Sequence, residues 1–128
     1  MNKPIKSTFY LAYNLTDSSR EQLLNRFPPQ FARVIAHHAT YEFGVTSDTV
    51  LPPIPTTARV VGYSSDGAIE ALVVEIDGST QRPDGSTYHI TLSLDPDKRK
   101  PVDSNRLLEA GWQSCEPYSI QVLPALNG

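Results

Sequence analysis

Cysteine, methionine and tryptophan are scarce in this sequence, with one of each among its 128 residues. A single cysteine, Cys115, cannot form an internal disulfide, and it cannot supply a zinc site built from several thiolates. No apolar run approaches the roughly 20 residues that a membrane-spanning helix needs, and the first residues lack the apolar segment of a secretory signal. We therefore expect no membrane association and a cytoplasmic location.

Positive charge is also in short supply, because 11 Lys and Arg residues face 14 Asp and Glu residues, which gives a net charge of −3. Tight binding to long duplex nucleic acid needs many Lys and Arg contacts with phosphates, so we expect no such partner. A small nucleotide or a single RNA end remains compatible, because one phosphate needs only a few local donors. The length predicts one domain over residues 1–128, which we expect to be a monomer.

The apolar pattern predicts several strands and two helices. Ser18 and Glu21 have the spacing of a capping box, and Pro28-Pro29 would end the helix that follows. The strands are expected at 7–14, 39–45, 58–64, 68–76, 87–94 and 118–123, and the second helix at 104–110. Antiparallel hairpins with a few helices predict an α+β domain. The prolines of residues 46–56 indicate a loop, which is a candidate flap over a site.

Two of the predicted strands carry the same short pattern, His38-Ala39-Thr40 and His89-Ile90-Thr91. On a strand, residues i and i+2 project from one face, about 6.5–7 Å apart. The apolar residues at 39, 41, 43 and 45 would face the core, which places His38 and Thr40 on the other face. The residues from 87 to 94 alternate in the same way, with Ser93 on the face of His89 and Thr91.

This pair of motifs suits chemistry at phosphorus. A neutral histidine can take a proton from an attacking water, and a protonated one can give a proton to the departing oxygen. The threonine hydroxyls can donate to the non-bridging phosphate oxygens. No motif typical of a metal site or a nucleotide-binding P-loop is present, so we expect no metal and no cofactor.

The motif segments resemble the two-histidine (2H) phosphoesterase superfamily, whose hallmark is a pair of His-x-Ser/Thr motifs. Residues 38–44 and 84–92 look most like 2′,3′-cyclic nucleotide 3′-phosphodiesterases and the phosphodiesterase domain of fungal and plant tRNA ligases. The resemblance implies two lobes of antiparallel sheet with flanking helices and a central cleft. It also implies hydrolysis of a 2′,3′-cyclic phosphate to a 2′-phosphate, with His38 and His89 as catalytic residues and Thr40 and Thr91 binding the phosphate.

Other residues are weaker candidates for the same site. Arg82, in the polar loop from 77 to 86, could reach a phosphate, although a solvated surface charge is the commoner case. Tyr10 and Tyr13 could stack a base, with core packing as the alternative. His37 is expected to face away from His38, unless a bulge turns it into the cleft. Lys98-Arg99-Lys100 is either a solvated run or an element that steers anions.

Three alternative functions stay open at this point. Cyclic oligonucleotide signals or 2′-5′ linkages would use the same chemistry on another substrate. A non-catalytic module that binds a nucleotide or an RNA end would keep the phosphate clamp without turnover. A subunit or interaction domain in which the two motifs are accidental would have histidines that do not converge on one site.

Overall fold

The computed structural model describes residues 9–128, so the first two residues of the predicted strand 7–14 lie outside the described part. The elements in chain order are β1 (Phe9–Leu15), α1 (Asp17–Arg26), β2 (Arg33–Val34), β3 (His38–Val45), β4 (Ala58–Ser65), β5 (Ile69–Ile76), β6 (His89–Leu94), α2 (Asp103–Glu109), β7 (Gln113–Ser119) and β8 (Val122–Asn127). Over residues 9–128, no helix is both long enough and apolar enough to cross a membrane.

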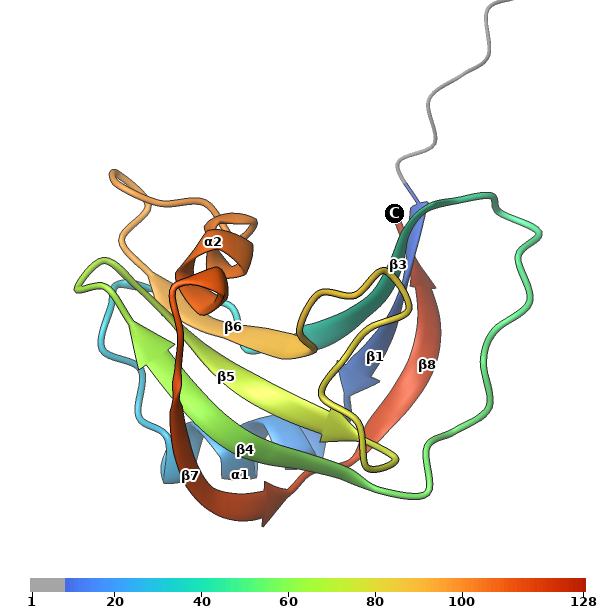
Figure 1. Cartoon of the computed structure of the whole chain (residues 1–128), viewed down its shortest axis with the longest axis horizontal. Helices are drawn as coiled ribbons and strands as arrows, with labels where there is room; N and C mark the ends of the chain where they lie inside the picture. The colour runs from blue at the N-terminus through green and yellow to red at the C-terminus, as the bar shows by residue number, and fades with distance from the viewer. Residues whose placement is uncertain (1–8) are drawn as a thin grey trace, which may run out of the picture.

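The strands form one antiparallel sheet that curls into a half-barrel (Figure 1). Its order is β7-β4-β5-β6-β3-β1-β8, with the short β2 added beside β6. The predicted α+β class is therefore confirmed. Within this single sheet, the halves β7-β4-β5-β6 and β3-β1-β8 are joined by a register of one residue pair, Ala39 with Ile90.

The two helices cover opposite faces of the sheet. Leu23 of α1 is fully buried in the main core, which it shares with Leu72 of β5 and Ile90 of β6. Leu108 of α2 packs instead on a small apolar cluster that includes Val73 of β5. Because Val73 lies opposite His89 in the β5–β6 ladder, the second histidine belongs to the face covered by α2.

Both ends of helix α1 follow from local sequence, but its beginning differs from the prediction. The helix is capped by Thr16, whose hydroxyl accepts a hydrogen bond from the backbone N–H of Ser19 at 3.3 Å. The predicted cap, Ser18, lies inside the first turn. Ser19 is buried and accepts from the N–H of Gln121, which ties the helix to the link between β7 and β8. As predicted, the helix ends before Pro28-Pro29.

The predicted last strand at 118–123 is wrong, because the chain changes partner within it. Residues up to Ser119 pair with β4, and residues from Val122 pair with β1. The buried Ile120 spans the turn between these edges of the half-barrel. Pro117 and Pro124 fit their strands because β7 and β8 are the edge strands, where a missing N–H is tolerated.

Register shifts also correct two predicted side-chain directions. The β1–β3 ladder skips Tyr41, since Leu11 pairs with Glu42 and Ala12 with Thr40. Phe43 therefore leaves the core face and is 57% exposed. The β5–β6 ladder skips Leu92 in the same way. Ser93 consequently turns away from the predicted face of Thr91, and its hydroxyl bonds the buried carboxylate of Glu70.

Candidate active site

The two His-x-Thr motifs lie side by side at the junction of the two halves of the sheet. Their middle residues, Ala39 and Ile90, are paired across the β3–β6 ladder, and both are fully buried in the main core. Side chains that flank such a pair point to the opposite face. The antiparallel direction then places His38 toward Thr91 and Thr40 toward His89. One backbone pairing thus gathers all four motif side chains on the α2 face.

All four side chains line one pocket of about 450 Å³. The loop before α2 and the start of that helix close one side with Val102 and Asn105, and Tyr10 of β1 lies on the other side. Five cationic or titratable nitrogen side chains contribute to the described lining, which contains no Asp or Glu: Arg33, His37, His38, Arg82 and His89. A lining with nitrogen-bearing side chains and without carboxylates favours an anionic ligand, although the net charge of the chain is negative.

His89 is held in a defined orientation. Its Nδ1 lies 2.9 Å from the carbonyl oxygen of Thr87, which can only accept, so Nδ1 carries the hydrogen and Nε2 remains available to a ligand. Burial lowers the pKa of His89, the positive charge of Arg82 lowers it further, and the hydrogen bond to Thr87 opposes this shift. At neutral pH this shift favours the uncharged form of His89 in the free protein.

Thr91 is tied to the segment that carries α2. Its hydroxyl lies 2.8 Å from the hydroxyl of Ser104 and 3.4 Å from the carbonyl oxygen of Pro101. Ser104 is fully buried, so this contact fixes helix α2 against the motif strand. Because the Pro101 carbonyl can only accept, the Thr91 hydroxyl donates to it, and an anion in the pocket would compete for that same hydrogen. Thr40 is 7% exposed and lies across the junction.

His38 is enclosed by other rings. The ring of Tyr10 lies 5.2 Å from it, and the ring of His37 lies 5.1 Å from it in an edge-on arrangement. The Nδ1 atoms of His37 and His38 are 2.8 Å apart. Burial lowers the pKa of His38 to about 4, and charge on His37 and His89 adds to the effect. At neutral pH His38 is therefore uncharged in the free protein.

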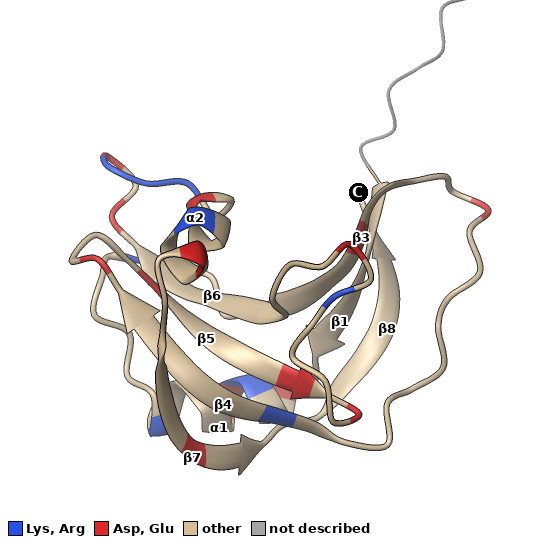
Figure 2. Cartoon of the chain, viewed as in Figure 1, with Lys and Arg blue, Asp and Glu red and all other residues tan. Residues whose placement is uncertain are grey.

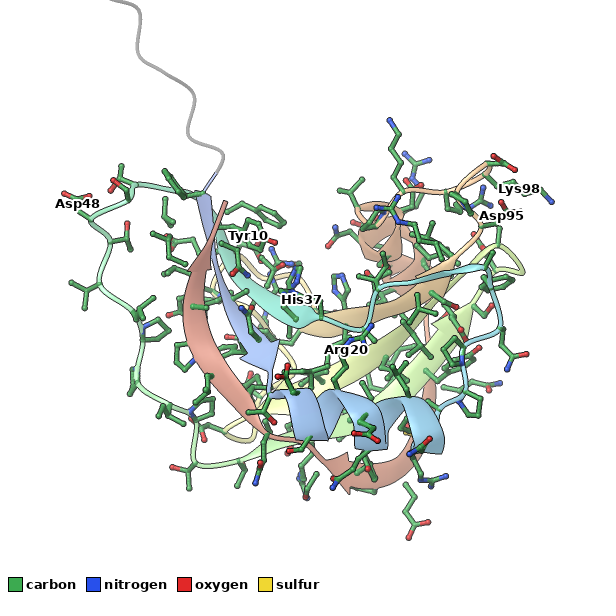
Figure 3. All side chains as sticks on the ribbon, turned by 180° about the vertical axis from the view of Figure 1, so that it is seen from behind. Tyr10, Arg20, His37, Asp48, Asp95 and Lys98 are labelled. Carbon is green, nitrogen blue, oxygen red and sulfur yellow. The ribbon has the colours of Figure 1, made fainter. Side chains whose placement is uncertain are left out.

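The segment that leads into the first motif is anchored from both sides. Ala36 adopts a left-handed conformation with φ of 42°, and its N–H donates to the carbonyl of Thr91 at 2.9 Å. From α1, Arg20 donates to the carbonyls of Ala36 at 2.9 Å and Ile35 at 3.4 Å. In Figure 3, Arg20 lies between α1 and His37. These bonds set the entry direction of His37 and His38.

Arg82 is a buried cation in the wall of the pocket. It is only 4% exposed, and its Nη2 donates to Asp84 at 3.0 Å. Within residues 9–128 its Nε and Nη1 have no hydrogen-bond partner. The guanidinium carbon lies 5.6 Å from the centre of the Phe43 ring. Two buried N–H groups at the wall of a pocket are costly unless a ligand accepts from them.

The structure brings six of the seven predicted site residues together: His38, Thr40, His89, Thr91, Arg82 and Tyr10. The exception is Tyr13, which is 5% exposed and packs in the core against Tyr41 and Tyr88. Tyr10 and Tyr13 are separated by an odd number of positions on one strand, so they point to opposite faces. Of the two alternatives given for Tyr13, core packing is therefore the one that the structure shows, and Tyr13 does not line the pocket.

Two other predictions concern loops around this pocket. The loop 46–56 does not line the pocket and lies on the outer side of β3 and β8, so it is not a flap (Figure 1). The basic run at 98–100 lies on the loop before α2 (Figure 2), where Arg99 bonds Asp66 at 2.9 Å, and it does not line the pocket.

Sequence reasoning missed Phe43, Arg33 and Asn105 as lining residues, and it placed His37 on the wrong face. A bulge turned Phe43 into the pocket, and the left-handed Ala36 brought His37 beside His38. Neither feature has a clear signal in the sequence, because Ala is an uncommon residue in the left-handed region. Only the adjacency of the two histidines pointed to a shared role.

In the described part of the chain, no group of three or more His, Cys, Asp or Glu side chains is arranged to hold a metal ion. Burial raises the pKa of the Cys115 thiol, which makes it a poor nucleophile.

Comparison with protein families, with curated proteins and with solved structures finds no match for this chain.

Proposed function

We propose that this chain is a metal-independent phosphodiesterase that hydrolyses a 2′,3′-cyclic phosphate on a nucleotide or an RNA end to a 2′-phosphate. The observation that carries the proposal is that one pocket holds both His-x-Thr motifs together with a buried guanidinium that has two unpaired N–H groups. The resemblance of the motif segments to two-histidine phosphoesterases supports the same chemistry.

The two histidines supply the proton transfers. One neutral imidazole takes a proton from a water molecule as the water oxygen attacks phosphorus. The bond from phosphorus to the 3′ oxygen then breaks, and the other imidazole, protonated when the substrate binds, gives its proton to that oxygen. An anionic ligand favours this protonation, because it offsets the burial and the positive charge that lower the pKa of His38 and His89.

Three side chains are suited to stabilising the charge on the non-bridging oxygens. The Thr40 and Thr91 hydroxyls lie in the pocket with the two histidines. Arg82 adds a permanent positive charge and two free N–H donors in a buried environment, where a charged hydrogen bond is strongest. These donors are held by the protein before substrate arrives, so little reorganisation accompanies the reaction.

The same pocket offers a surface for a nucleobase. Tyr10 and Phe43 lie side by side with ring centres 5.5 Å apart, and Phe43 is exposed. A base stacked on such aromatic rings gains about 1–3 kcal/mol. The volume of about 450 Å³ lies within the usual range for pockets that hold small ligands. A nucleoside cyclic phosphate therefore suits both the polar and the aromatic parts of the lining.

The test is an assay of the purified protein on a 2′,3′-cyclic mononucleotide in the presence of a chelator, with the product identified by phosphorus NMR. We expect a 2′-phosphate, a bell-shaped pH profile and loss of turnover in His89→Ala. A 2′-5′ linked oligonucleotide and a cyclic dinucleotide are assayed in parallel. If the protein hydrolyses the 2′-5′ linked oligonucleotide or the cyclic dinucleotide faster, that compound class replaces the 2′,3′-cyclic phosphate as the proposed substrate, and the proposed acid–base chemistry stays the same.

Three outcomes would contradict the proposal. Tight binding of the cyclic phosphate without product would establish a binding module. Strong stimulation by a divalent metal, or near-normal turnover in His89→Ala, would show that the two histidines do not perform the reaction.

A further inference from the structure

His37 is the one histidine that the proposed reaction does not use. It precedes β3, its side chain is exposed at the edge of the pocket, and it is a neighbour of His38 in sequence and in space. His37 and Tyr10, both labelled in Figure 3, line the same pocket. In a regular strand the two adjacent histidines would point to opposite faces. The left-handed backbone of Ala36 and the bonds from Arg20 bring both rings into one site.

The contact between the two rings constrains where hydrogens can be. The Nδ1 atoms are 2.8 Å apart, so a hydrogen bond between them requires that one nitrogen carries a hydrogen and the other does not. His38 therefore has its Nδ1 occupied by His37, and Nε2 is the nitrogen left for a substrate or a water. If both rings gained an extra proton, two positively charged imidazoles would lie about one hydrogen-bond length apart, which is unfavourable.

We propose that His37 is a positioning residue of the site, which holds the ring of His38 through the Nδ1 contact and controls the pH at which His38 gains a proton. This proposal rests on the proposed function for its catalytic meaning. The ring contact itself is a property of the free protein and can be tested without any substrate.

Other groups also face the pair and set the electrostatic background. They are Tyr10 on β1, Arg33 on β2, Arg82 in the loop before β6 and His89 on β6, while Arg20 of α1 bonds the backbone just before His37. Among the described residues that line this pocket none is acidic. Charge on His37 is a cause of the lowered pKa of His38, second to burial.

Two substitutions separate the two effects of His37. In His37→Asn, the side-chain amide can bond Nδ1 of His38 but cannot become charged. In His37→Ala, both the bond and the charge are lost. We expect the pKa of His38 to rise in both variants, as followed by NMR of the ring. We expect turnover at the pH optimum to fall about tenfold in the alanine variant and to stay within about threefold of the parent in the asparagine variant.

The pH profile of kcat/KM adds a readout that a merely structural residue would not move. If His38 takes the proton from water, the acidic limb moves to higher pH in both variants. If His38 gives the proton to the leaving group, the alkaline limb moves to higher pH instead. Lys98→Ala, which removes an exposed charge away from the pocket, is the control and should leave both limbs in place.

The proposal is overturned if the His38 resonances titrate identically in the parent and in His37→Asn, or if neither limb of the profile moves. Thermal unfolding of each variant shows whether a loss of turnover reflects a loss of fold. A parent protein that is inactive on cyclic phosphates would overturn the proposed function alone, since the NMR titration still decides whether the two rings are coupled.

Discussion

Ala39 and Ile90 face each other across the β3–β6 ladder, and each is the middle residue of a His-x-Thr motif. In the described part of the chain, this pair is the whole register between the two halves of the sheet, whereas the neighbouring ladders contain several pairs each. Small and branched side chains suit the two positions because both are fully buried. The proposed active site therefore lies at the β3–β6 junction, where the two halves of the sheet are joined by one residue pair.

Removal of either motif histidine should abolish most of the activity. We expect His38→Ala and His89→Ala to lower kcat by about 10²–10⁴-fold, because each removes one of two proton-transfer groups. Steady-state hydrolysis of a 2′,3′-cyclic mononucleotide measures the effect, with circular dichroism as the check on folding. A double variant no worse than either single one would show that the two act as a unit.

Replacement of Arg82 should weaken ligand binding while stabilising the fold. Arg82→Met keeps much of the packing on Phe43 but removes two buried N–H groups that have no partner. Loss of a charged hydrogen bond of about 1.5–3 kcal/mol should raise the Kd for inorganic phosphate about 10–100-fold. The midpoint of thermal unfolding should rise, as is common where function requires unpaired polar groups.

Calorimetric titration with phosphate and a thermal melt test both parts of this prediction. Lys98→Met serves as the matched control, because it exchanges an exposed cation for the same residue type. Unchanged phosphate affinity together with a lower unfolding midpoint would assign Arg82 a structural role.

Acid should destabilise the protein partly through His38. The pKa of His38 is lowered to about 4 in the folded protein. Between about pH 6.5 and pH 4, His38 is therefore protonated in the unfolded chain but not in the folded protein. The free energy of unfolding should therefore fall as pH falls through this window, by about 1–3 kcal/mol from this group. Above about pH 6.5 the contribution is constant.

Urea unfolding of the parent and of His38→Gln between pH 7 and pH 4.5 isolates this effect from the carboxylates, which titrate in both proteins. As the pH falls, the free energy of unfolding of the parent should decrease relative to that of His38→Gln. A difference that is independent of pH would mean that His38 titrates normally in the folded state.

Two fully buried alanines near the first motif should respond differently to glycine. Ala36 has a φ of 42°, whereas Ala39 lies in strand β3. Glycine removes one methyl group at either site, but at position 36 it also relieves a left-handed conformation that costs an L-residue about 1–2 kcal/mol. We expect Ala39→Gly to be more destabilising than Ala36→Gly by about that amount. Equal losses in urea unfolding would mean that the segment before β3 is unstrained.

The motif residues and most elements could be predicted from the sequence because they depend on local patterns. Alternation marks strands such as β5 and β6, proline pairs end α1, and two histidines with threonine at i+2 are visible by inspection. The pocket face of each motif also followed from the two-residue period of a strand. These inferences need no knowledge of what lies across the ladder.

The errors arose where tertiary contacts altered a local pattern. Bulges opposite Leu11 and Glu70 reversed the directions of Phe43 and Ser93, since one extra residue shifts every later side chain to the other face. The last strand was divided because its two ends pair with different edges of a curled sheet.

By itself, the sequence determined the class of fold, the two motif strands and the face on which each His and Thr lies, because these follow from side-chain period and type. Only the tertiary structure decided that the motifs meet through Ala39 and Ile90, that Arg82 is buried with free donors, and that His37 contacts His38. The reason is that pairing, burial and ring contacts depend on residues distant in the chain or on a local backbone conformation that tertiary contacts impose.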